Sequence, residues 1–269
     1  MAIYSDERIE FFDRKKRSKP KHMEVAHFHS KHEMYYLEKG KTKYFIGDEI
    51  FILNPGDMVF VPKGVFHKTD GEENQKSERL LFIFDDDFVG EKFIPYLNSL
   101  KENKFIQFAP EHLYKMKELF RKIEDESSKK HSDYKTMLRL YLDEMLVMIS
   151  RFRIKSNTPQ LSESYTIIQN AARYISSNTC ADLSLNSLAE KYAMSPSHFS
   201  KLFKSVTGVK LCEYINIARV SAAEKLLAES DMPITAVAME CGFNDSNYFA
   251  TVFRKLKGVS PKKYSKNRY

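Results

Sequence analysis

Residues 199–209 read FSKLFKSVTGV, and residues 249–259 read FATVFRKLKGV, so one pattern returns after fifty residues. In each copy apolar residues stand at i, i+3 and i+4, which places an apolar stripe along one side of a short helix. A segment of small and apolar residues precedes each copy, at 185–189 and 234–238. The stretch 184–263 is therefore predicted to contain the same pair of helices twice.

The turn before each copy carries helix-capping signals. Ser195 and Pro196 supply an N-cap hydroxyl and a proline at the first helical position, where its missing N–H costs nothing. In the second copy Gly242 suits a left-handed turn, and Asp245 suits the N-cap. Two helices joined by a tight turn form the helix-turn-helix pattern, whose second helix enters the major groove of DNA.

A rotation of about 100° per residue predicts which side chains face away from each apolar stripe. In the first copy these are Ser197, Lys201 and Lys204, flanked by His198 and Ser200. In the second copy they are Asn247, Thr251 and Arg254, flanked by Ala250 and Lys255. Such hydrogen-bonding and cationic groups suit base edges and phosphates. The alternative is an ordinary solvated helix face, and the presence of two copies in a basic segment favours DNA binding.

Residues 211–229, between the copies, are predicted to form one helix about 28 Å long at 1.5 Å per residue. Its apolar side is predicted to consist of Leu211, Tyr214, Ile215, Ala218, Ala222 and Leu226. A helix of this length can hold two recognition helices about one DNA turn, roughly 34 Å, apart. One polypeptide is thus expected to read two successive major grooves.

This segment resembles the DNA-binding domain of the AraC/XylS family of transcription regulators. The matching residues include Leu188, Ala189, Ser195, Phe199, Phe203, Gly208, Arg219, Gly242, Phe243, Asp245, Phe249, Phe253, Gly258, Pro261 and Tyr264. The resemblance implies that bases are read by Ser197, Ser200 and Lys201, and by Ser246, Asn247, Ala250 and Thr251. Ala250 and Thr251 stand where longer polar groups are common in the family. The second helix is therefore expected to read bases weakly, with Arg254 and the basic tail contributing phosphate affinity.

Charge and cysteine usage agree with a DNA-binding protein of a reducing compartment. The net charge is +7, residues 161–269 hold 14 Lys and Arg against 9 Asp and Glu, and residues 254–269 hold seven basic residues and no acidic one. Such a basic end fits a polyanionic partner. Three cysteines without a CxxC pair argue against a disulfide framework or zinc finger and indicate the cytoplasm. No signal peptide or membrane span is expected.

The first half of the chain has a different texture. Residues 1–22 are polar and basic and are interpreted as an N-terminal arm. Short β-rich runs follow at 33–38, 43–46, 50–53, 58–61 and 80–84, separated by turn signals at Gly40, 47–48, 54–57 and 62–64. Strands at this spacing predict a small β-barrel or jelly roll.

This region resembles the cupin barrel. The first cupin motif is matched by His27, His29, Glu33 and Gly40, and the second by Gly56, Pro62, Gly64 and His67, although Gly71 stands where an asparagine is usual. In one continuous strand, His27, His29, Glu33, Tyr35 and Leu37 would share a face and point into the barrel. Imidazole and carboxylate groups suit Zn²⁺, Fe²⁺, Mn²⁺ or Ni²⁺. Three readings stay open: a metal site of His27, His29, Glu33 and His67; a metal-free effector pocket that adds Tyr35; and an inherited scaffold. No cofactor is required by the sequence.

Two helical stripes precede the DNA-binding segment. The first consists of Leu113, Met116, Leu119, Phe120 and Ile123, and the second runs through residues 134–152. The second helix is more apolar than one packed face needs, because Met137, Leu140, Leu146 and Val147 lie outside its main stripe. Burial on the barrel and a homodimer interface of paired helices both explain this excess.

The predicted fold is a two-domain α+β protein. A cupin-like effector-binding and dimerisation domain occupies 1–155, a linker 156–163, and an all-α domain with two helix-turn-helix motifs 164–269. The predicted function is a non-enzymatic regulator that binds double-stranded DNA under the control of a small-molecule effector, for which sugars are one class. The resemblance favours activation, which would add RNA polymerase as a partner. The alternatives are a metal-dependent cupin enzyme fused to a DNA-binding domain, and an architectural DNA binder.

Overall fold

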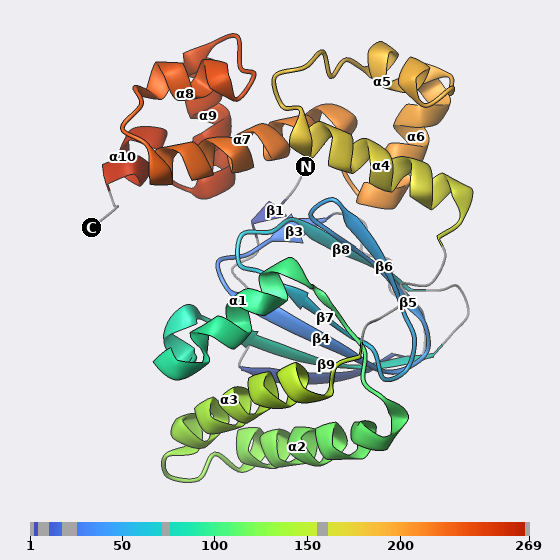
Figure 1. Cartoon of the computed structure of the whole chain (residues 1–269), viewed down its shortest axis with the longest axis vertical. Coiled ribbons are helices and arrows are strands. Elements are labelled where there is room, and N and C mark those ends of the chain that lie inside the picture. The colour runs from blue at the N-terminus through green and yellow to red at the C-terminus, as the bar shows by residue number, and fades with distance from the viewer. Residues whose placement is uncertain (1–2, 5–10, 18–25, 72–75, 155–160, 267–269) are drawn as a thin grey trace. The chain divides into compact units, whose positions relative to one another are not determined.

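The computed structural model describes residues 3–4, 11–17, 26–71, 76–154 and 161–266 (Figure 1). The chain divides into two compact units, one formed within residues 5–160 and the other by residues 161–269 together with the first four residues. The division falls at residue 160, inside the stretch predicted as a linker. Residues 156–160 of that stretch lie outside the described residues.

The N-terminal unit contains two antiparallel sheets. One has the strand order β3 (His27–Phe28), β8 (His67–Gly71), β5 (Thr42–Ile46), β6 (Glu49–Leu53). The two-residue strand β1 (Ile3–Tyr4) is grouped with the C-terminal unit. The other has the order β10 (Phe105–Ile106), β7 (Met58–Val61), β4 (His32–Lys39), β9 (Ser77–Phe84), β2 (Phe12–Arg17). The described strands thus form two separate sheets, so the jelly-roll form of the cupin prediction is observed and a continuously closed barrel is not.

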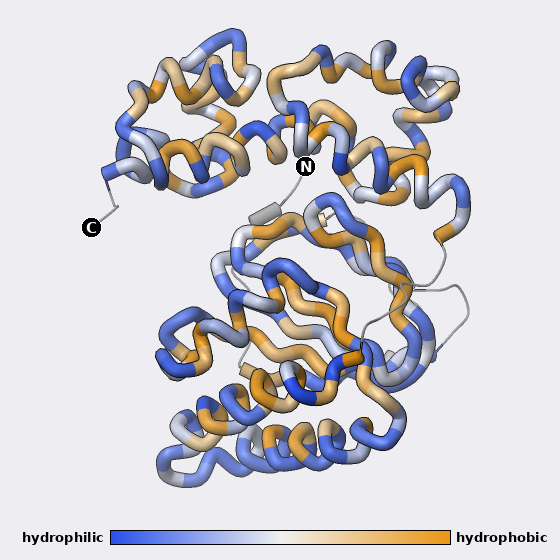
Figure 2. Tube along the Cα trace, viewed as in Figure 1, coloured by the Kyte–Doolittle hydropathy of each residue, from blue (hydrophilic) through white to orange (hydrophobic). Residues whose placement is uncertain are grey.

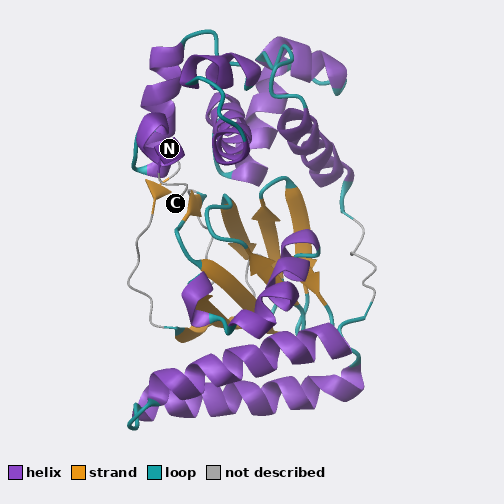
Figure 3. Ribbon diagram, turned by 60° about the vertical axis from the view of Figure 1, so that its left-hand side comes forward, coloured by secondary structure: helices purple, strands orange, loops and turns teal. Residues whose placement is uncertain are grey.

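Alternation along the strands gives the second sheet two apolar faces, because successive side chains of a strand point to opposite sides. On one face, Tyr35 and Leu37 pack with Tyr44, Ile46 and Phe51 of the first sheet. The opposite face packs against three helices, α1 (Ile94–Glu102), α2 (Pro110–Lys129) and α3 (Tyr134–Phe152). Hydrophobic residues follow the strands of both sheets in Figure 2, and Figure 3 shows α2 and α3 as a hairpin beside the sheet.

Two expectations for this unit are corrected. Residues 12–17 are part of the sheet as β2 rather than of an arm, because they pair with β9 in register and the Phe12 ring lies 5.3 Å from that of Phe82. The condition of one continuous strand from His27 to Leu37 is also not met, since β3 and β4 belong to different sheets. The chain crosses between the sheets at residues 29–31, where the His29 carbonyl accepts a hydrogen bond from the Gly64 N–H at 2.8 Å.

Packing in the α2–α3 hairpin explains only part of the apolar excess noted for residues 134–152. Leu146 is buried in the core, whereas Leu140 is 55% exposed and Met137 and Val147 are partly exposed. Two short 3-10 turns, η1 (Asp86–Phe88) and η2 (Glu91–Phe93), lead into α1. The buried Asp143 carboxylate of α3 accepts a hydrogen bond from the Gly90 N–H at 3.1 Å and holds this connection.

The C-terminal unit is all helical. Its elements are α4 (Glu163–Ser177), α5 (Leu185–Lys191), α6 (Pro196–Thr207), α7 (Leu211–Glu229), α8 (Ile234–Glu240), α9 (Ser246–Lys257) and α10 (Pro261–Lys266). Helices α5 and α6 lie toward one end of α7, and α8 and α9 toward the other (Figure 1). The predicted caps form: Ser195 Oγ accepts the His198 N–H at 3.3 Å, and Asp245 Oδ1 accepts the Tyr248 N–H at 2.8 Å.

The internal repeat continues beyond the aligned helices. Gly208 and Gly258 end α6 and α9 in the left-handed region, with φ of 82° and 74°. Phe203 packs edge-on against Tyr214 at 5.3 Å, and Phe253 packs in the same way against Tyr264 at 5.4 Å. Tyr214 and Tyr264 are again fifty residues apart, so α10 corresponds to the first turns of α7.

The predicted buried side of α7 is correct only in its first half. Leu211, Tyr214 and Ile215 are buried, but farther along the buried residues are Val220, Ala223 and Leu227 instead of Ala218, Ala222 and Leu226. The later three pack with α8 and α9 in a core that contains Phe243 and Phe249. Because the two ends of α7 serve two different helix pairs, no single stripe describes the whole helix.

Candidate functional site

The outward face of α6 presents the side chains predicted to face DNA. Ser197, His198, Lys201 and Lys204 are exposed and Ser200 is half-buried, while Phe199 and Phe203 on the opposite face are fully buried. This division follows from the helical period, because residues three and four apart share a face. The α6 helix therefore offers hydroxyl, imidazole and ammonium groups on one surface.

Helix α9 presents a different surface. Asn247, Thr251, Arg254 and Lys255 are exposed, whereas Ser246 and Ala250 are half-buried. The Thr251 hydroxyl donates a hydrogen bond to the Asn247 carbonyl at 3.0 Å within its own helix, so its proton is used there and only its oxygen lone pairs and methyl group are left for an outside partner. This agrees with the weaker base reading expected of α9.

One exposed aromatic on α9 was not among the residues predicted to face DNA. Tyr248 is 52% exposed, and its hydroxyl accepts a hydrogen bond from the Asn216 side chain of α7 at 2.9 Å. The bond ties the start of α9 to the middle of the central helix. Helical period placed Tyr248 off both the buried stripe and the outward face, so the sequence pattern gave no signal for it.

The second helix-turn-helix is fixed against the rest of its unit by a close backbone contact. Gly242 has φ of 85°, and a Cβ there would come closer than 3.0 Å to the Thr179 carbonyl oxygen. The same oxygen accepts a hydrogen bond from Arg219 Nε at 3.1 Å, and the Arg219 guanidinium lies 5.7 Å from the Phe243 ring centre. Arg219, in mid-α7, thus links the loop before α5 to the turn before α9.

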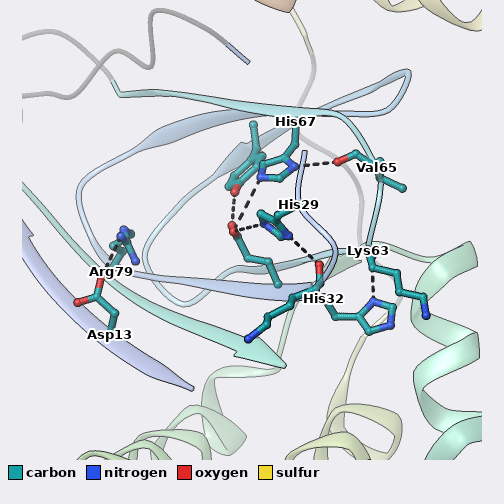
Figure 4. A network of polar contacts seen from close by, with 10 residues as sticks. Asp13, His29, His32, Lys63, Val65, His67 and Arg79 are labelled. Atoms are coloured by element: carbon teal, nitrogen blue, oxygen red, sulfur yellow. Dashed lines mark hydrogen bonds and ion pairs between the residues drawn. The ribbon is translucent and has the colours of Figure 1, made fainter. Parts of the chain in front are cut away.

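In the N-terminal unit, three histidines from both cupin motifs converge, and Figure 4 shows two of them, His29 and His67. His27, His29 and His67 each offer a ring nitrogen within 4.8 Å of the others. Glu33 Oε2 lies 3.3 Å from His29 Nε2 and 3.8 Å from His67 Nε2. His27 and His67 are paired across β3 and β8, and Glu33 comes from β4 of the facing sheet. The structure therefore brings together all four predicted ligands, from two sheets rather than from one strand.

The ring contacts decide which nitrogen atoms face the cluster. His29 Nδ1 lies 2.7 Å from the Lys31 carbonyl, and His67 Nδ1 lies 2.9 Å from the Val65 carbonyl. A carbonyl only accepts, so each Nδ1 carries a proton and donates it. In the neutral ring each Nε2 turns a lone pair toward the Glu33 carboxylate, whereas a protonated His29 ring donates its Nε2–H to Glu33 Oε2. His67 Nε2 is buried without a hydrogen-bond partner among the described residues.

The electrostatics of the cluster keep Glu33 charged. Burial would raise the pKa of Glu33, but the hydrogen bond from His29, the nearby His67 and the Tyr44 hydroxyl together hold that pKa at about 2. Burial lowers the pKa of the His67 ring. When the two rings are neutral, the Glu33 carboxylate and the Nε2 lone pairs of His29 and His67 form a set of electron donors. Such a set suits a divalent transition metal or the hydrogen-bond donors of a small molecule.

Two residues of this interior were not found from the sequence. Tyr44 of β5 donates its hydroxyl to Glu33 and packs edge-on against the predicted Tyr35, at 5.2 Å. Arg79 of β9 lies over the Tyr35 ring, 5.8 Å from its centre. Both residues lie on strands that hold none of the predicted site residues. Polar residues alternating with apolar ones are common in any half-buried strand, so the sequence did not mark these two as site residues.

Paired helix-turn-helix motifs in one unit and a cupin-like pair of sheets in the other define a two-domain DNA-binding regulator. Residues 188–267 match a family described as a helix-turn-helix domain, and residues 17–84 match one described as a cupin domain. Both domains expected from the resemblance to the AraC/XylS family of transcription regulators are thus matched.

Two curated relatives align with most of the chain. The HTH-type transcriptional activator RhaR of Mannheimia succiniciproducens is 22% identical over 88% of this chain and 86% of its own length. The HTH-type transcriptional activator RhaS of Escherichia coli is 22% identical over 90% of this chain and 87% of its own. Among solved structures, ToxT of Vibrio cholerae O395 covers 95% of this chain and 97% of that one, at 17% identity and a TM-score of 0.38.

Hydropathy adds one observation about the helices. Within the described residues, none of them combines the length and the apolar character that crossing a bilayer demands.

Proposed function

We propose that this protein is a ligand-controlled transcription activator whose two recognition helices, α6 and α9, read two successive major grooves. The observation that carries the proposal is the fifty-residue structural repeat: two capped helices with buried phenylalanines inside and exposed polar side chains outside, at the two ends of α7. The family resemblance and the names of the activators RhaR and RhaS support the direction of control. RNA polymerase is then a partner on the promoter.

Within this proposal the two recognition helices have different tasks. Lys201 with Ser197 and Ser200 on α6 reads base edges, because an ammonium and hydroxyls suit the guanine acceptors of the major groove. On α9, Asn247 supplies one amide for adenine, while Arg254 and Lys255 bind phosphate. His198, Lys204, Ser246 and Thr251 complete the surface with backbone and methyl contacts. Most of the sequence preference is thus expected from α6.

The effector is proposed to bind beside His27, His29, Glu33, Tyr35 and His67. Their convergence on the inner side of the sheets supports this, because five polar side chains drawn from both sheets meet where the neighbouring side chains are apolar. Hydroxyl groups, as in a sugar, would donate to the Glu33 carboxylate and to the Nε2 lone pairs. Binding would favour one arrangement of the regulator over another, by no more than the difference in affinity for the two.

The same residues fit a divalent transition metal. Each ring of His29 and His67 donates its other N–H to a backbone carbonyl, which is the outer contact that fixes a metal-binding imidazole. A bound cation would neutralise Glu33 and present a Lewis-acidic position to oxygen atoms of the effector. Protein purified without a polyhistidine tag is expected to hold near-stoichiometric metal. His67→Ala should lose it, whereas the exposed His131→Ala should keep it. A full ligand response by metal-free protein would contradict the metal site and remain consistent with the effector pocket.

A second copy of the chain is proposed to cover the outer face of α3. Met137, Leu140 and Val147 leave an apolar strip there, and a strip with this spacing suits pairing with another helix. Leu140→Glu should lower the mass measured by light scattering from dimer to monomer. Lys135→Glu, an exposed change on the same helix, should not.

The test of the function starts with selection of binding sites from random duplexes by the full-length protein. The selected site should contain two half-sites, and Lys201→Ala should relax only one of them. Control by an effector is then measured as ligand-dependent transcription from that site, with His27→Ala combined with His67→Ala. An unchanged ligand response in the double variant would contradict the effector pocket. Selection without any consensus would contradict sequence-specific regulation and favour an architectural DNA binder.

A further inference from the structure

A buried guanidinium lies on the inner face of the second sheet, four positions along from Glu33. Arg79 of β9 pairs with Leu37 of β4, while Glu33 pairs with Ile83. Residues paired across an antiparallel ladder share a face, so Arg79 points to the same side as Glu33. Arg79 is 8% exposed. Figure 4 shows it with Asp13 on the same side of the sheets as the histidine cluster.

The hydrogen bonds of Arg79 are incomplete. Its Nη2 donates to Asp13 Oδ2 at 3.2 Å, which is long for a charge-assisted bond. Its Nη1 is buried and has no hydrogen-bond partner among the described residues. A buried charged donor without an acceptor is costly, because it has lost its water and gained nothing in return. Nη1 of Arg79 is therefore a buried donor that an acceptor from outside the described chain would satisfy.

A purely structural role for the Arg79–Asp13 pair explains only part of this arrangement. The pair connects the edge strand β2 to β9, and Asp13 stands opposite Leu81 rather than opposite Arg79. From that position it takes one N–H of the fork. Guanidinium groups bind planar oxyanions through two parallel N–H donors, and within the described chain Asp13 occupies only the Nη2 side of this fork.

The interior is polar at two separated places with aromatic rings between them. The anionic Glu33 and the histidines mark one place and Arg79 the other, and Tyr35 and Tyr44 lie between. Glu33 and Leu37, the partner of Arg79, are four residues apart on β4, about 13 Å at 3.3 Å per residue. The Arg79 guanidinium lies 5.8 Å from the ring centre of Tyr35, which stands between Glu33 and Leu37 on β4.

We propose that the effector is a small organic anion whose carboxylate or phosphate binds Arg79 while its hydroxyl groups meet the His29, His67 and Glu33 cluster. The inference rests on the proposed effector function and specifies its ligand class. A neutral sugar would leave Nη1 of Arg79 unpaired. A hydroxylated acid or a sugar phosphate pairs both ends of the interior.

The test uses inorganic and simple anions on the full-length protein, because the effector itself need not be known. Sodium acetate and sodium phosphate are titrated against sodium chloride at equal ionic strength, and thermal unfolding of the N-terminal unit is followed by calorimetry. The two anions separate the carboxylate from the phosphate source. Saturable stabilisation is expected for at least one of them. Arg79→Met should weaken it roughly tenfold to a hundredfold, the loss of one charge-assisted contact.

Two controls keep the result interpretable. Arg121→Met removes an exposed arginine on α2 and should leave anion binding unchanged. Asp13→Asn removes the competing carboxylate and should tighten anion binding. If Arg79→Met fails to fold, Arg79→Lys, which keeps the charge without the fork, should bind more weakly than wild type. Equal responses of wild type and Arg79→Met, no saturable response, or weakening by Asp13→Asn would overturn the proposal.

The outcome separates this inference from the function on which it rests. If a neutral effector controls transcription through His27 and His67 and the response is unchanged in Arg79→Met, the anionic ligand class is wrong while the proposed regulator function stands. Anion binding at Arg79 in a protein whose transcription responds to no ligand would do the reverse.

Discussion

Gly242→Ala tests the rigid connection between the two helix-turn-helix motifs. Gly242 has φ of 85°, and an alanine in the left-handed region costs roughly 1–2 kcal/mol. The new methyl group would also come closer than 3.0 Å to the Thr179 carbonyl, which is backbone and yields only if the loop moves. That movement breaks the bond from Arg219 at 3.1 Å, a charge-assisted contact worth about 1.5–3 kcal/mol. The expected loss of folding free energy is therefore about 3–5 kcal/mol.

Gly258→Ala is the matched control. Gly258 has φ of 74°, and nothing lies within 4 Å of a Cβ placed there. Only the backbone term applies, so a loss of about 1–2 kcal/mol is expected. Urea unfolding of both full-length variants, followed by circular dichroism at the helical band, measures the difference. Equal losses in the two variants would refute the claim that Thr179 and Arg219 hold the second motif in place.

Three further predictions concern the binding surfaces. Lys201→Ala should reduce the binding free energy by about 1–3 kcal/mol at one base position if the contact is bidentate. Thr251→Ala should leave base preference nearly unchanged, because the Thr251 hydroxyl already donates its proton within α9. Competition binding with single-base variants of the site measures both effects. Lys262→Ala with Lys263→Ala should weaken binding to all sequences and reduce the slope against log salt by about 2, and an unaltered slope would place these lysines away from phosphate. Because the pKa of Glu33 is held at about 2, its carboxylate should stabilise the folded N-terminal unit above pH 4.5, the ordinary pKa of the group, and this contribution should disappear between pH 4.5 and 2. The free energies of unfolding of wild type and Glu33→Gln should therefore converge at the acid end of that interval.

The C-terminal unit was predictable because its signals are local. The caps at Ser195 and Asp245 and the glycines at 208 and 258 are each decided within a few residues. The change in the buried face along α7, where Ala223 rather than Ala222 is buried, could not be predicted, because it depends on which helices pack at each end of α7.

The N-terminal unit shows the opposite balance. His27, His29, Glu33 and His67 were found from motif spacing, although the single strand that would have carried the first three is broken between two sheets. Pairings between distant segments, such as β2 with β9, leave no periodic signal in a short polar strand. For the same reason the partners that Glu33 and Tyr35 acquire from β5 and β9 could be seen only in three dimensions.

The central claim is that one polypeptide reads two successive major grooves. Hydroxyl-radical and methylation footprints of the full-length protein on its selected site test it most directly. Each chain is expected to protect two major-groove segments on one face of the duplex, about 10–10.5 base pairs apart. Lys201→Ala should remove protection from one segment and spare the other. A single protected groove for each chain, or protection that spreads evenly along the duplex, would contradict the account.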